Sequence, residues 1–362
     1  MKEQFLLYKL NNMSLSEKIG QMIMIDYRDV TEMNVELENI LTKYNPGGFI
    51  LFKSNIANFE QTKKLLNDIK NVGEIKSFIS VDQEGGRVQR LDSRVGFDSY
   101  PPMGEIGKSM DEKIAFDLGV KMGAELKLIG VDMDMAPVLD IFSNPENRVI
   151  ADRAFGSTSD VVKKMAFAYA DGLKKENIIA VGKHFPGHGD TVKDSHIDLP
   201  VIDKSLEDLK QLELIPFIEA VKQKLPALMV AHIAVPKVTG DNLPSSLSSV
   251  MVNDLLKEDM GYNGLIMPDS LKMRALSNYF TNEDIYLRCV QAGNDFLLMP
   301  QDINDAFNVI YRKVNEGLIS ENRIDMSVYK ILSTKFDYGF FDKEYFEFLK
   351  YNSIGLNNGV RK

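Results

Sequence analysis

Short runs of consecutive apolar residues recur along the whole chain, and each is bounded by turn-forming residues and followed by a longer stretch with helical periodicity. Such uninterrupted runs are typical of parallel strands that are buried on both faces of a sheet. The pattern predicts eight strands, at residues 19–26, 48–52, 78–82, 131–136, 179–184, 227–232, 265–269 and 296–299.

Segments between the expected strands have the spacing of amphipathic helices. Residues 59–69 place their apolar side chains on one stripe, and residues 206–221 form a second expected helix, which Ser205 opens with Asp208 as its capping partner. The alternation of eight strands with helices in 362 residues favours an α/β fold of the (β/α)8 barrel type over a doubly wound sheet.

The sequence gives no sign of a division into several domains, because no fixed-period repeat, low-complexity tract or Pro/Ser-rich linker interrupts it. We expect a single barrel domain at residues 13–341, after an N-terminal extension at residues 1–12. Residues 342–362 are polar with scattered aromatic side chains, which predicts a C-terminal tail that is either a terminal helix or partly mobile.

Composition and charge exclude several classes of protein. The chain is 44% hydrophobic and 26% charged, as globular proteins are, and its net charge of −9 argues against a nucleic-acid partner. The single cysteine, Cys289, excludes an internal disulfide and a thiolate metal cluster. The N-terminus lacks the apolar core and cleavage site of a signal peptide, and no apolar run is long enough to span a membrane. We therefore expect a cytoplasmic protein without membrane contact, either a monomer or a weak homo-oligomer.

Ionisable side chains interrupt the apolar pattern where four of the expected strands end. They are Asp82 at the third strand, Lys183 and His184 at the fifth, His232 at the sixth and Asp269 at the seventh. The carboxyl ends of barrel strands carry the reactive residues of barrel enzymes, and burial of several charges there is otherwise unfavourable. The joint pattern predicts an active site, and all four histidines lie at or after the ends of the fifth and sixth strands: His184, His188, His196 and His232.

Local patterns leave the roles of individual residues open. Asp269 is either a reactive carboxylate at the barrel mouth or a cap for the helix that could follow it. Asp194 and His196 are separated by one residue, which in an extended loop places both side chains on the same side. The carboxylate could then fix the tautomer of the imidazole and raise its basicity, but a solvated loop with incidental polar residues explains the local pattern equally well.

A metal site is an alternative reading of the same residues. Four histidines and several aspartates could form a zinc site, as in metal-dependent barrel hydrolases. No His-x-His pair ends the first expected strand, however, so we predict no metal and no other cofactor.

Seven segments, in this order along the chain, identify a family: LSEKIGQM, VDQEGGRVQRL, APVLDI, VIADRAFG, GKHFPGHGDTVKDSH, IMPDSLKM and AGNDFLLMP. The chain resembles the family 3 glycoside hydrolases, and among them the single-barrel bacterial β-N-acetylglucosaminidases (β-hexosaminidases). The resemblance extends over residues 13–341. Its most specific part is the pattern KHFPGHGDT followed by DSH.

The resemblance implies roles for individual residues. It implies that Asp269 is the nucleophile that attacks the anomeric carbon, and that His196, held by Asp194, is the acid/base that protonates the leaving oxygen. It also implies that five residues hold the hydroxyls and the acetamido group of the non-reducing sugar: Asp82, Arg90, Arg153, Lys183 and His184. We assign no role to His188 or His232.

The implied reaction is a metal-independent, retaining removal of terminal N-acetylglucosamine through a covalent glycosyl-enzyme. For a cytoplasmic enzyme, the implied substrates are peptidoglycan-derived muropeptides or their disaccharides, in cell-wall recycling. A histidine acid/base is neutral after the first step and does not repel an anion, so the same residues also suit an N-acetylglucosaminide phosphorylase. A β-glucosidase of the same family is a further alternative.

Overall fold

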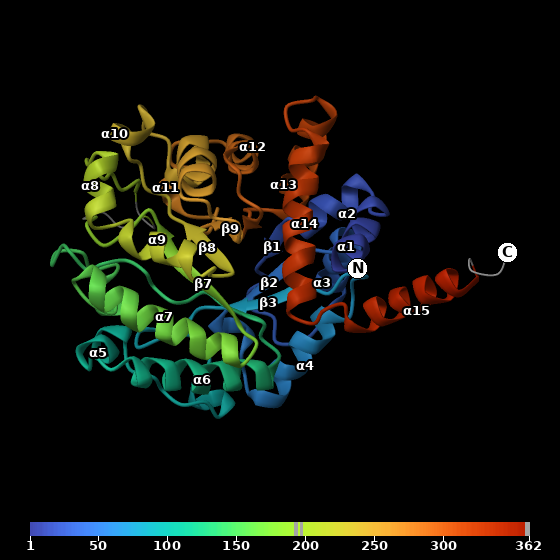
Figure 1. The fold of residues 1–362 in the computed structure, drawn as a ribbon, viewed down its shortest axis with the longest axis horizontal. Helices are drawn as coiled ribbons and strands as arrows, with labels where there is room; N and C mark the ends of the chain where they lie inside the picture. The colour runs from blue at the N-terminus through green and yellow to red at the C-terminus, as the bar shows by residue number, and fades with distance from the viewer. Residues whose placement is uncertain (192–194, 196–197, 359–362) are drawn as a thin grey trace.

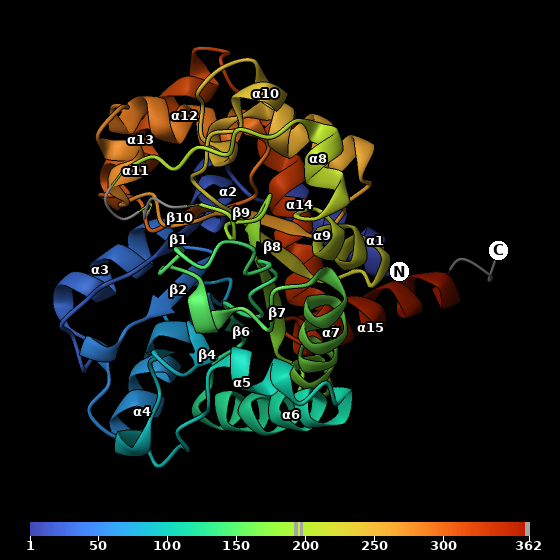
Figure 2. The same cartoon turned by 90° about the vertical axis from the view of Figure 1, so that its left-hand side faces the viewer.

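The computed structural model describes residues 1–191, 195 and 198–358. Eight strands form one parallel sheet at the centre of the molecule, in the order β10-β1-β2-β3-β6-β7-β8-β9 (Figures 1 and 2). They are β1 (Ile23–Ile25), β2 (Gly48–Leu51), β3 (Phe78–Val81), β6 (Met133–Asp134), β7 (Ile179–Phe185), β8 (Ala227–Val230), β9 (Leu265–Pro268) and β10 (Leu297–Leu298). Each lies within or overlaps one of the expected strands, so the predicted strand positions are confirmed.

Asp295 joins the two ends of the sheet. Its backbone N–H donates to the carbonyl oxygen of Ile266 at 2.7 Å, and its carboxylate oxygen Oδ2 accepts from the Ile266 N–H at 2.9 Å. These bonds connect β9 to the segment that leads into β10, while β10 itself pairs with β1. The ring of strands therefore closes, and the predicted (β/α)8 barrel is confirmed.

Helices surround the strands on the outside (Figure 2). They are α2 (Leu15–Gln21), α3 (Val35–Tyr44), α4 (Phe59–Lys70), α5 (Met103–Lys108), α6 (Glu112–Ile129), α7 (Ser159–Lys175), α8 (Leu206–Gln211), α9 (Ile215–Lys222), α10 (Pro236–Thr239), α11 (Arg274–Ser277), α12 (Asn282–Ala292), α13 (Ile303–Asn315) and α14 (Glu321–Asp337). Shorter pieces are the 3-10 helices η1 (Lys53–Asn55), η2 (Ser93–Val95), η3 (Ala151–Arg153) and η4 (Ser245–Leu247), the π-helix η5 (Val250–Asp259), and the hairpin of β4 (Gln83–Gly85) and β5 (Val88–Gln89).

The first strand is shorter than expected, because residues 15–21 form α2 and β1 begins only at Ile23. The hydroxyl of Ser14 accepts from the Glu17 N–H, and the Glu17 carboxylate accepts from the Ser14 N–H. This capping box starts a helix whose last residues, 19–21, extend into the stretch that was expected to be a strand.

The helix expected at residues 206–221 is divided into α8 and α9. The predicted capping pair is present, since Ser205 and Asp208 bond reciprocally at the start of α8. Pro216, however, lies in the first turn of α9 and has no N–H with which to continue the hydrogen bonding of α8. One expected helix therefore becomes two.

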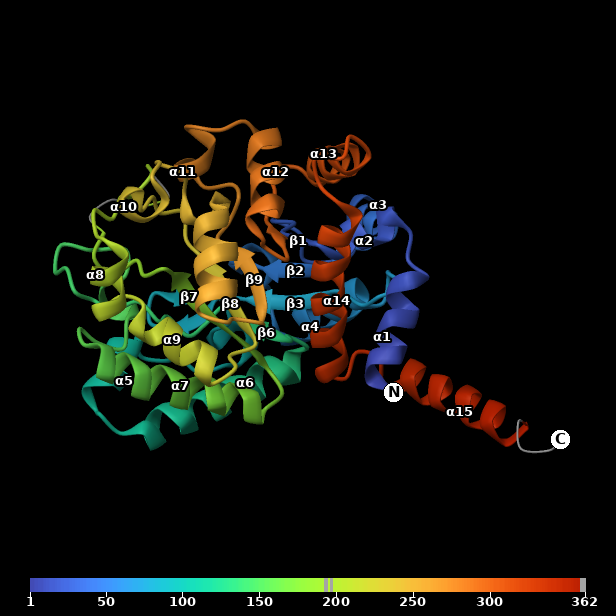
Figure 3. The same ribbon diagram turned by 45° about the horizontal axis from the view of Figure 1, so that its top comes forward.

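Both segments that flank the expected barrel are helical. α1 (Lys2–Asn11) and α15 (Asp342–Asn358) meet around Phe5, and α15 then extends away from the barrel (Figures 1 and 3). The Phe5 ring centroid lies between 5.3 and 5.9 Å from those of Phe336, Phe341, Tyr345 and Phe348. Of the two alternatives for the C-terminal segment, residues 342–358 thus form the terminal helix. No described helix is long and apolar enough to cross a membrane.

Lys335 on α14 is fully buried and lies beside Phe78, the first residue of β3. Its Nζ donates to Oε1 of Gln21 at 2.7 Å and lies 5.1 Å from the ring centroid of Phe78. Burial lowers the pKa of Lys335 to about 7, against an opposing effect of Asp132. Since the ordinary pKa is 10.5, the unfolded chain binds this proton more tightly than the folded protein does.

Stability is therefore expected to rise with pH between about 7 and 10 through this one group, by up to about 1.4 kcal/mol per pH unit. Lys335→Met removes the titrating amine, so the difference in free energy of unfolding between wild type and variant should change across this interval. Urea unfolding at several pH values measures it, with exposed Lys64→Met on α4 as the control. Parallel curves for wild type and Lys335→Met would contradict the prediction.

Candidate active site

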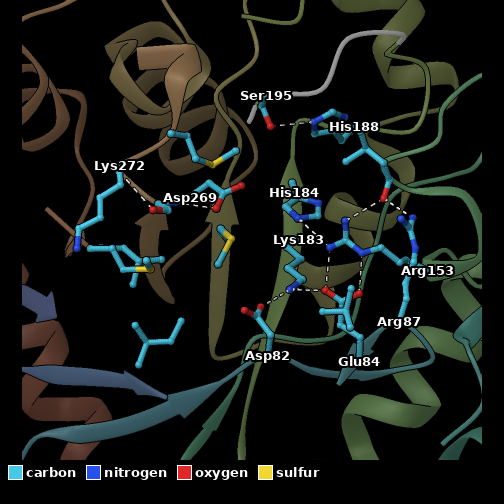
Figure 4. A pocket seen from close by; sticks show the side chains of 18 of the residues that line it. Asp82, Glu84, Arg87, Arg153, Lys183, His184, His188, Ser195, Asp269 and Lys272 are labelled. Carbon is cyan, nitrogen blue, oxygen red and sulfur yellow. Dashed lines mark hydrogen bonds and ion pairs between the residues drawn. The ribbon is translucent and has the colours of Figure 1, made fainter. Parts of the chain in front are cut away.

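A cavity of about 1070 Å³ lies at the carboxyl ends of the strands (Figure 4). Its lining includes every predicted site residue that the structure describes: Asp82, Arg90, Arg153, Lys183, His184 and Asp269. Asp194 and His196 lie outside the described residues, and Ser195 between them in the sequence lines the cavity. The barrel thus brings together residues that are up to 187 positions apart, from 82 to 269.

Asp269 follows the last residue of β9, and its carboxylate faces the cavity (Figure 4). Its backbone N–H donates to the carbonyl oxygen of Val230 at 2.8 Å, which continues the β8–β9 pairing. Its Oδ1 accepts from the Ser270 N–H at 2.7 Å. The next helix, α11, has Met273 as its N-cap residue. The alternative that Asp269 caps this helix is therefore wrong.

Opposing effects act on the pKa of Asp269. Burial raises it, whereas His184, His232, the hydrogen bond from the Ser270 N–H and the charge of Lys183 lower it, and the lowering effects prevail. The carboxylate is therefore ionised at neutral pH, as a nucleophile must be.

Lys183 at the end of β7 joins two carboxylates from the segment that follows β3. Its Nζ lies 2.9 Å from Oδ1 of Asp82 and 2.6 Å from Oε1 of Glu84. Arg90 binds the second oxygen of Asp82 at 3.0 Å. Arg153 forms a bidentate pair with Glu84, through Nε at 2.7 Å and Nη2 at 2.8 Å. The result is a row of alternating charges that runs Arg90, Asp82, Lys183, Glu84, Arg153.

The two carboxylates of this row and Lys183 between them are held in their charged forms by their neighbours. Burial would raise the pKa of Asp82 and Glu84, but Lys183 and Arg90 lower the pKa of Asp82, and Arg153 and Lys183 hold that of Glu84 well below its usual range. Burial would lower the pKa of Lys183, whereas Asp82 and Glu84 raise it above its ordinary value. Paired in this way, buried charges remain ionised at neutral pH.

Two buried acidic residues of the site were not predicted from the sequence. Glu84 is 2% exposed and bridges Lys183 and Arg153, and Asp140 is 0% exposed with its Oδ2 2.6 Å from Nδ1 of His184. Signals for both exist in the sequence: Glu84 is two positions after Asp82, and Asp140 ends an apolar segment after the fourth expected strand. The partners of Glu84 and Asp140 are distant in the chain, so no local sequence pattern predicts these contacts.

The two histidines without a predicted role contact loops that carry other site residues. His232 Nε2 lies 2.9 Å from the carbonyl oxygen of Ser270, and its Nδ1 lies 2.6 Å from Oγ of Ser246. Because a carbonyl oxygen only accepts, Nε2 carries the hydrogen. His188 Nε2 lies 3.4 Å from Oγ of Ser195, and burial, together with His184, lowers the pKa of His188.

Within the part of the chain that the structure describes, no group of three or more His, Cys, Asp or Glu side chains could hold a metal ion. Asp194 and His196 lie outside the described residues, so independence of metals stays a prediction.

Comparisons with known proteins agree with this arrangement. Residues 14–334 match the model of the glycosyl hydrolase family 3 N terminal domain. A β-hexosaminidase of Idiomarina loihiensis is 33% identical over 323 residues, which cover 85% of this chain and 96% of the relative. One of Methylobacillus flagellatus is 36% identical over 279 residues, or 75% of this chain and 78% of the relative.

A solved structure of a glycoside hydrolase family 3 β-N-acetylglucosaminidase from Paenibacillus sp. str. FPU-7 has a TM-score of 0.87 and 34% sequence identity. The match covers 91% of this chain and 63% of the Paenibacillus chain, so this chain spans less than two thirds of that protein's length.

Glu84→Gln is expected to lower the free energy of unfolding by about 3 kcal/mol or more, because it leaves the guanidinium group of Arg153 without its carboxylate and leaves buried Lys183 with Asp82 alone. The pKa of Glu84 is far below its usual range, so its contribution to stability is fully present above the ordinary carboxyl pKa and is lost progressively as the pH falls from there toward the pKa in the folded protein. The loss in the variant should therefore be similar at pH 6 and pH 8 in urea unfolding.

The matched control is Glu283→Gln, because Glu283 also binds two cations, Arg312 and Lys313, but its side chain is 45% exposed. Its substitution should change the free energy of unfolding far less than Glu84→Gln does, because ion pairs at the surface contribute little to stability. Equal effects of the two substitutions would mean that the buried row of charges does not stabilise the fold.

Proposed function

The chain belongs to glycoside hydrolase family 3, and from this premise we propose that it is a retaining, exo-acting β-N-acetylglucosaminidase. It removes N-acetylglucosamine from the non-reducing end of its substrate. The observation that carries the proposal is the partly buried, ionised carboxylate of Asp269, which shares one cavity with the charged row of Asp82, Lys183 and Glu84. The names of the β-hexosaminidase relatives support the sugar specificity.

In the proposed first step, the carboxylate of Asp269 attacks the anomeric carbon, and the bond from that carbon to the leaving oxygen breaks. His196 gives its proton to the leaving oxygen, and Asp194 stabilises the imidazolium before this transfer. In the second step, neutral His196 takes a proton from water, which attacks the anomeric carbon and releases Asp269. Two displacements on the same carbon retain the β configuration.

The remaining predicted residues hold the sugar in this mechanism. The hydroxyls and the acetamido group are bound by His184 and by four members of the charged row: Asp82, Arg90, Lys183 and Arg153. The ion pairs within the row fix the orientations of these side chains before the substrate binds. Such preorganised charges are what stabilises a transition state electrostatically.

For the aglycone, we propose a peptidoglycan-derived muropeptide or its disaccharide, in cell-wall recycling. This part rests on the family resemblance and on the expected cytoplasmic location. The oligomeric state, monomer or weak homo-oligomer, stays a prediction as well.

The proposal predicts that the protein releases p-nitrophenol faster from its β-N-acetylglucosaminide than from its β-glucoside. Asp269→Ala should lower kcat on the former about a thousandfold or more, because it removes the nucleophile. EDTA should have no effect, and Asp241→Ala, at an exposed loop position, is the control.

Other outcomes of this assay decide among the alternatives. Glucoside preference would indicate a β-glucosidase, activity that requires phosphate and yields a sugar 1-phosphate would indicate a phosphorylase, and loss of activity with EDTA would indicate a metal-dependent hydrolase. An active Asp269→Ala variant would refute the nucleophile assignment.

The acid/base assignment predicts that His196→Ala loses far more activity on p-nitrophenyl than on 2,4-dinitrophenyl N-acetylglucosaminide, because the better leaving group departs without a proton. Azide, which needs no general base, should accelerate the variant and yield the β-glycosyl azide. Asp269→Ala serves as the comparison, because this variant should lose activity on both substrates equally. A His196→Ala variant that azide does not accelerate would count against the assignment.

A further inference from the structure

Asp140 lies after β6, in a segment that runs beside the end of β7. The Leu139 N–H donates to the carbonyl oxygen of Lys183 at 2.6 Å, and Val138 forms a parallel bridge with Lys183. These contacts place the Asp140 side chain, which is 0% exposed, directly behind His184. His184 itself lines the cavity.

The two carboxylate oxygens of Asp140 have different partners. Oδ1 accepts from the backbone N–H of His188 at 2.6 Å and from that of His184 at 3.2 Å. Oδ2 lies 2.6 Å from Nδ1 of the His184 ring. The two backbone donors fix the orientation of the carboxylate, so that Oδ2 can only face the imidazole.

This geometry determines which nitrogen of His184 carries the hydrogen. A carboxylate oxygen accepts, so Nδ1 donates to Oδ2, and in the neutral imidazole Nε2 is left with its lone pair. On the other side of the ring, Nη2 of Arg153, which is a donor, lies 3.5 Å from Nε2. A ring with a hydrogen on Nε2 would point that hydrogen at a guanidinium group.

We propose that Asp140 is a positioning residue that fixes the Nδ1–H tautomer of His184, so that Nε2 accepts a hydrogen bond from a hydroxyl or amide N–H of the bound sugar. Asp140 does not touch the substrate in this role. The tautomer follows from the contacts within the protein alone. The bound sugar as the donor to Nε2 rests on the proposed function.

The isosteric substitution Asp140→Asn reverses the polarity of this contact. The amide oxygen stays with the two backbone N–H donors, so the amide NH2 group takes the place of Oδ2. An NH2 group donates, so Nδ1 of His184 has to accept, and the ring hydrogen moves to Nε2. The size of the side chain is unchanged while the imidazole becomes a donor toward the cavity.

The direct test is a long-range 1H–15N correlation spectrum of the full chain labelled with 15N-histidine. The protein has four histidines, and the variant His184→Asn identifies the signals of His184. The expected result is a protonated Nδ1 and an unprotonated Nε2 in the wild type, and the reverse in Asp140→Asn. A wild-type ring with a hydrogen on Nε2, or a tautomer that Asp140→Asn does not change, overturns the proposal.

Asp134→Asn is the matched control, because Asp134 is another acidic residue with 0% exposure, on the adjacent β6. It accepts from the Gln83 N–H at 3.0 Å and from the Tyr169 hydroxyl at 2.9 Å. If burial of an amide alone disturbed the site, Asp134→Asn would alter the His184 signals as well. We expect them to be unchanged, and a changed His184 tautomer in this control counts against a specific role of Asp140.

A double-mutant cycle measures the functional effect. Asp140→Asn and His184→Ala should each lower kcat/KM for p-nitrophenyl β-N-acetylglucosaminide by about 10- to 100-fold, and the double variant should fall no further than His184→Ala. Additive losses would show that Asp140 does not act through His184. The spectrum reports the tautomer whether or not this substrate is cleaved, so failure of the proposed function and failure of this inference are distinguishable.

Discussion

The ammonium group of Lys183 is the buried charge on which the arrangement of the site depends. A cation loses its hydration in such a place, and only neighbouring anions compensate for that loss. Asp82 and Glu84 provide the compensation, and each of them binds a second cation, Arg90 and Arg153 respectively. Both outer cations line the cavity. The charged groups of the site are therefore already in position, through folding alone, when a sugar binds.

The parallel barrel is what allows this row of charges to form. β3, β6 and β7 are adjacent and parallel, so the segments that follow them meet at one rim. Glu84 comes from the first of these segments, Asp140 from the second and Lys183 from the end of the third. The register of β7 on β8 shifts between Lys183 and Phe185. Irregularities of this kind re-aim side chains, and here Lys183 and His184 both line the cavity although they are consecutive.

The sequence predicted the features that local patterns encode. Eight apolar runs sufficed for the barrel, and polar residues at the ends of those runs sufficed for the position of the cavity. Features were missed where two local patterns in the same segment favour different structures. The capping box at Ser14 makes part of an expected strand helical, and Pro216 divides an expected helix into two. Glu84 and Asp140 were missed for a different reason. Their partners Arg153 and His184 are 69 and 44 positions away, and only the closed barrel brings them into contact.

Two of the histidines that the structure describes, His184 and His232, differ from the proposed acid/base in one physical respect. An acid/base has to lose and regain its proton in every turnover, so its proton must be free to exchange with the substrate. In His184 and His232, contacts within the protein fix the position of the ring hydrogen: Asp140 binds Nδ1 of His184, and the Ser270 carbonyl binds Nε2 of His232. These rings are suited to recognition and to holding the loop of the neighbouring carboxylate. Proton transfer is better served by a histidine elsewhere, which is the role proposed for His196.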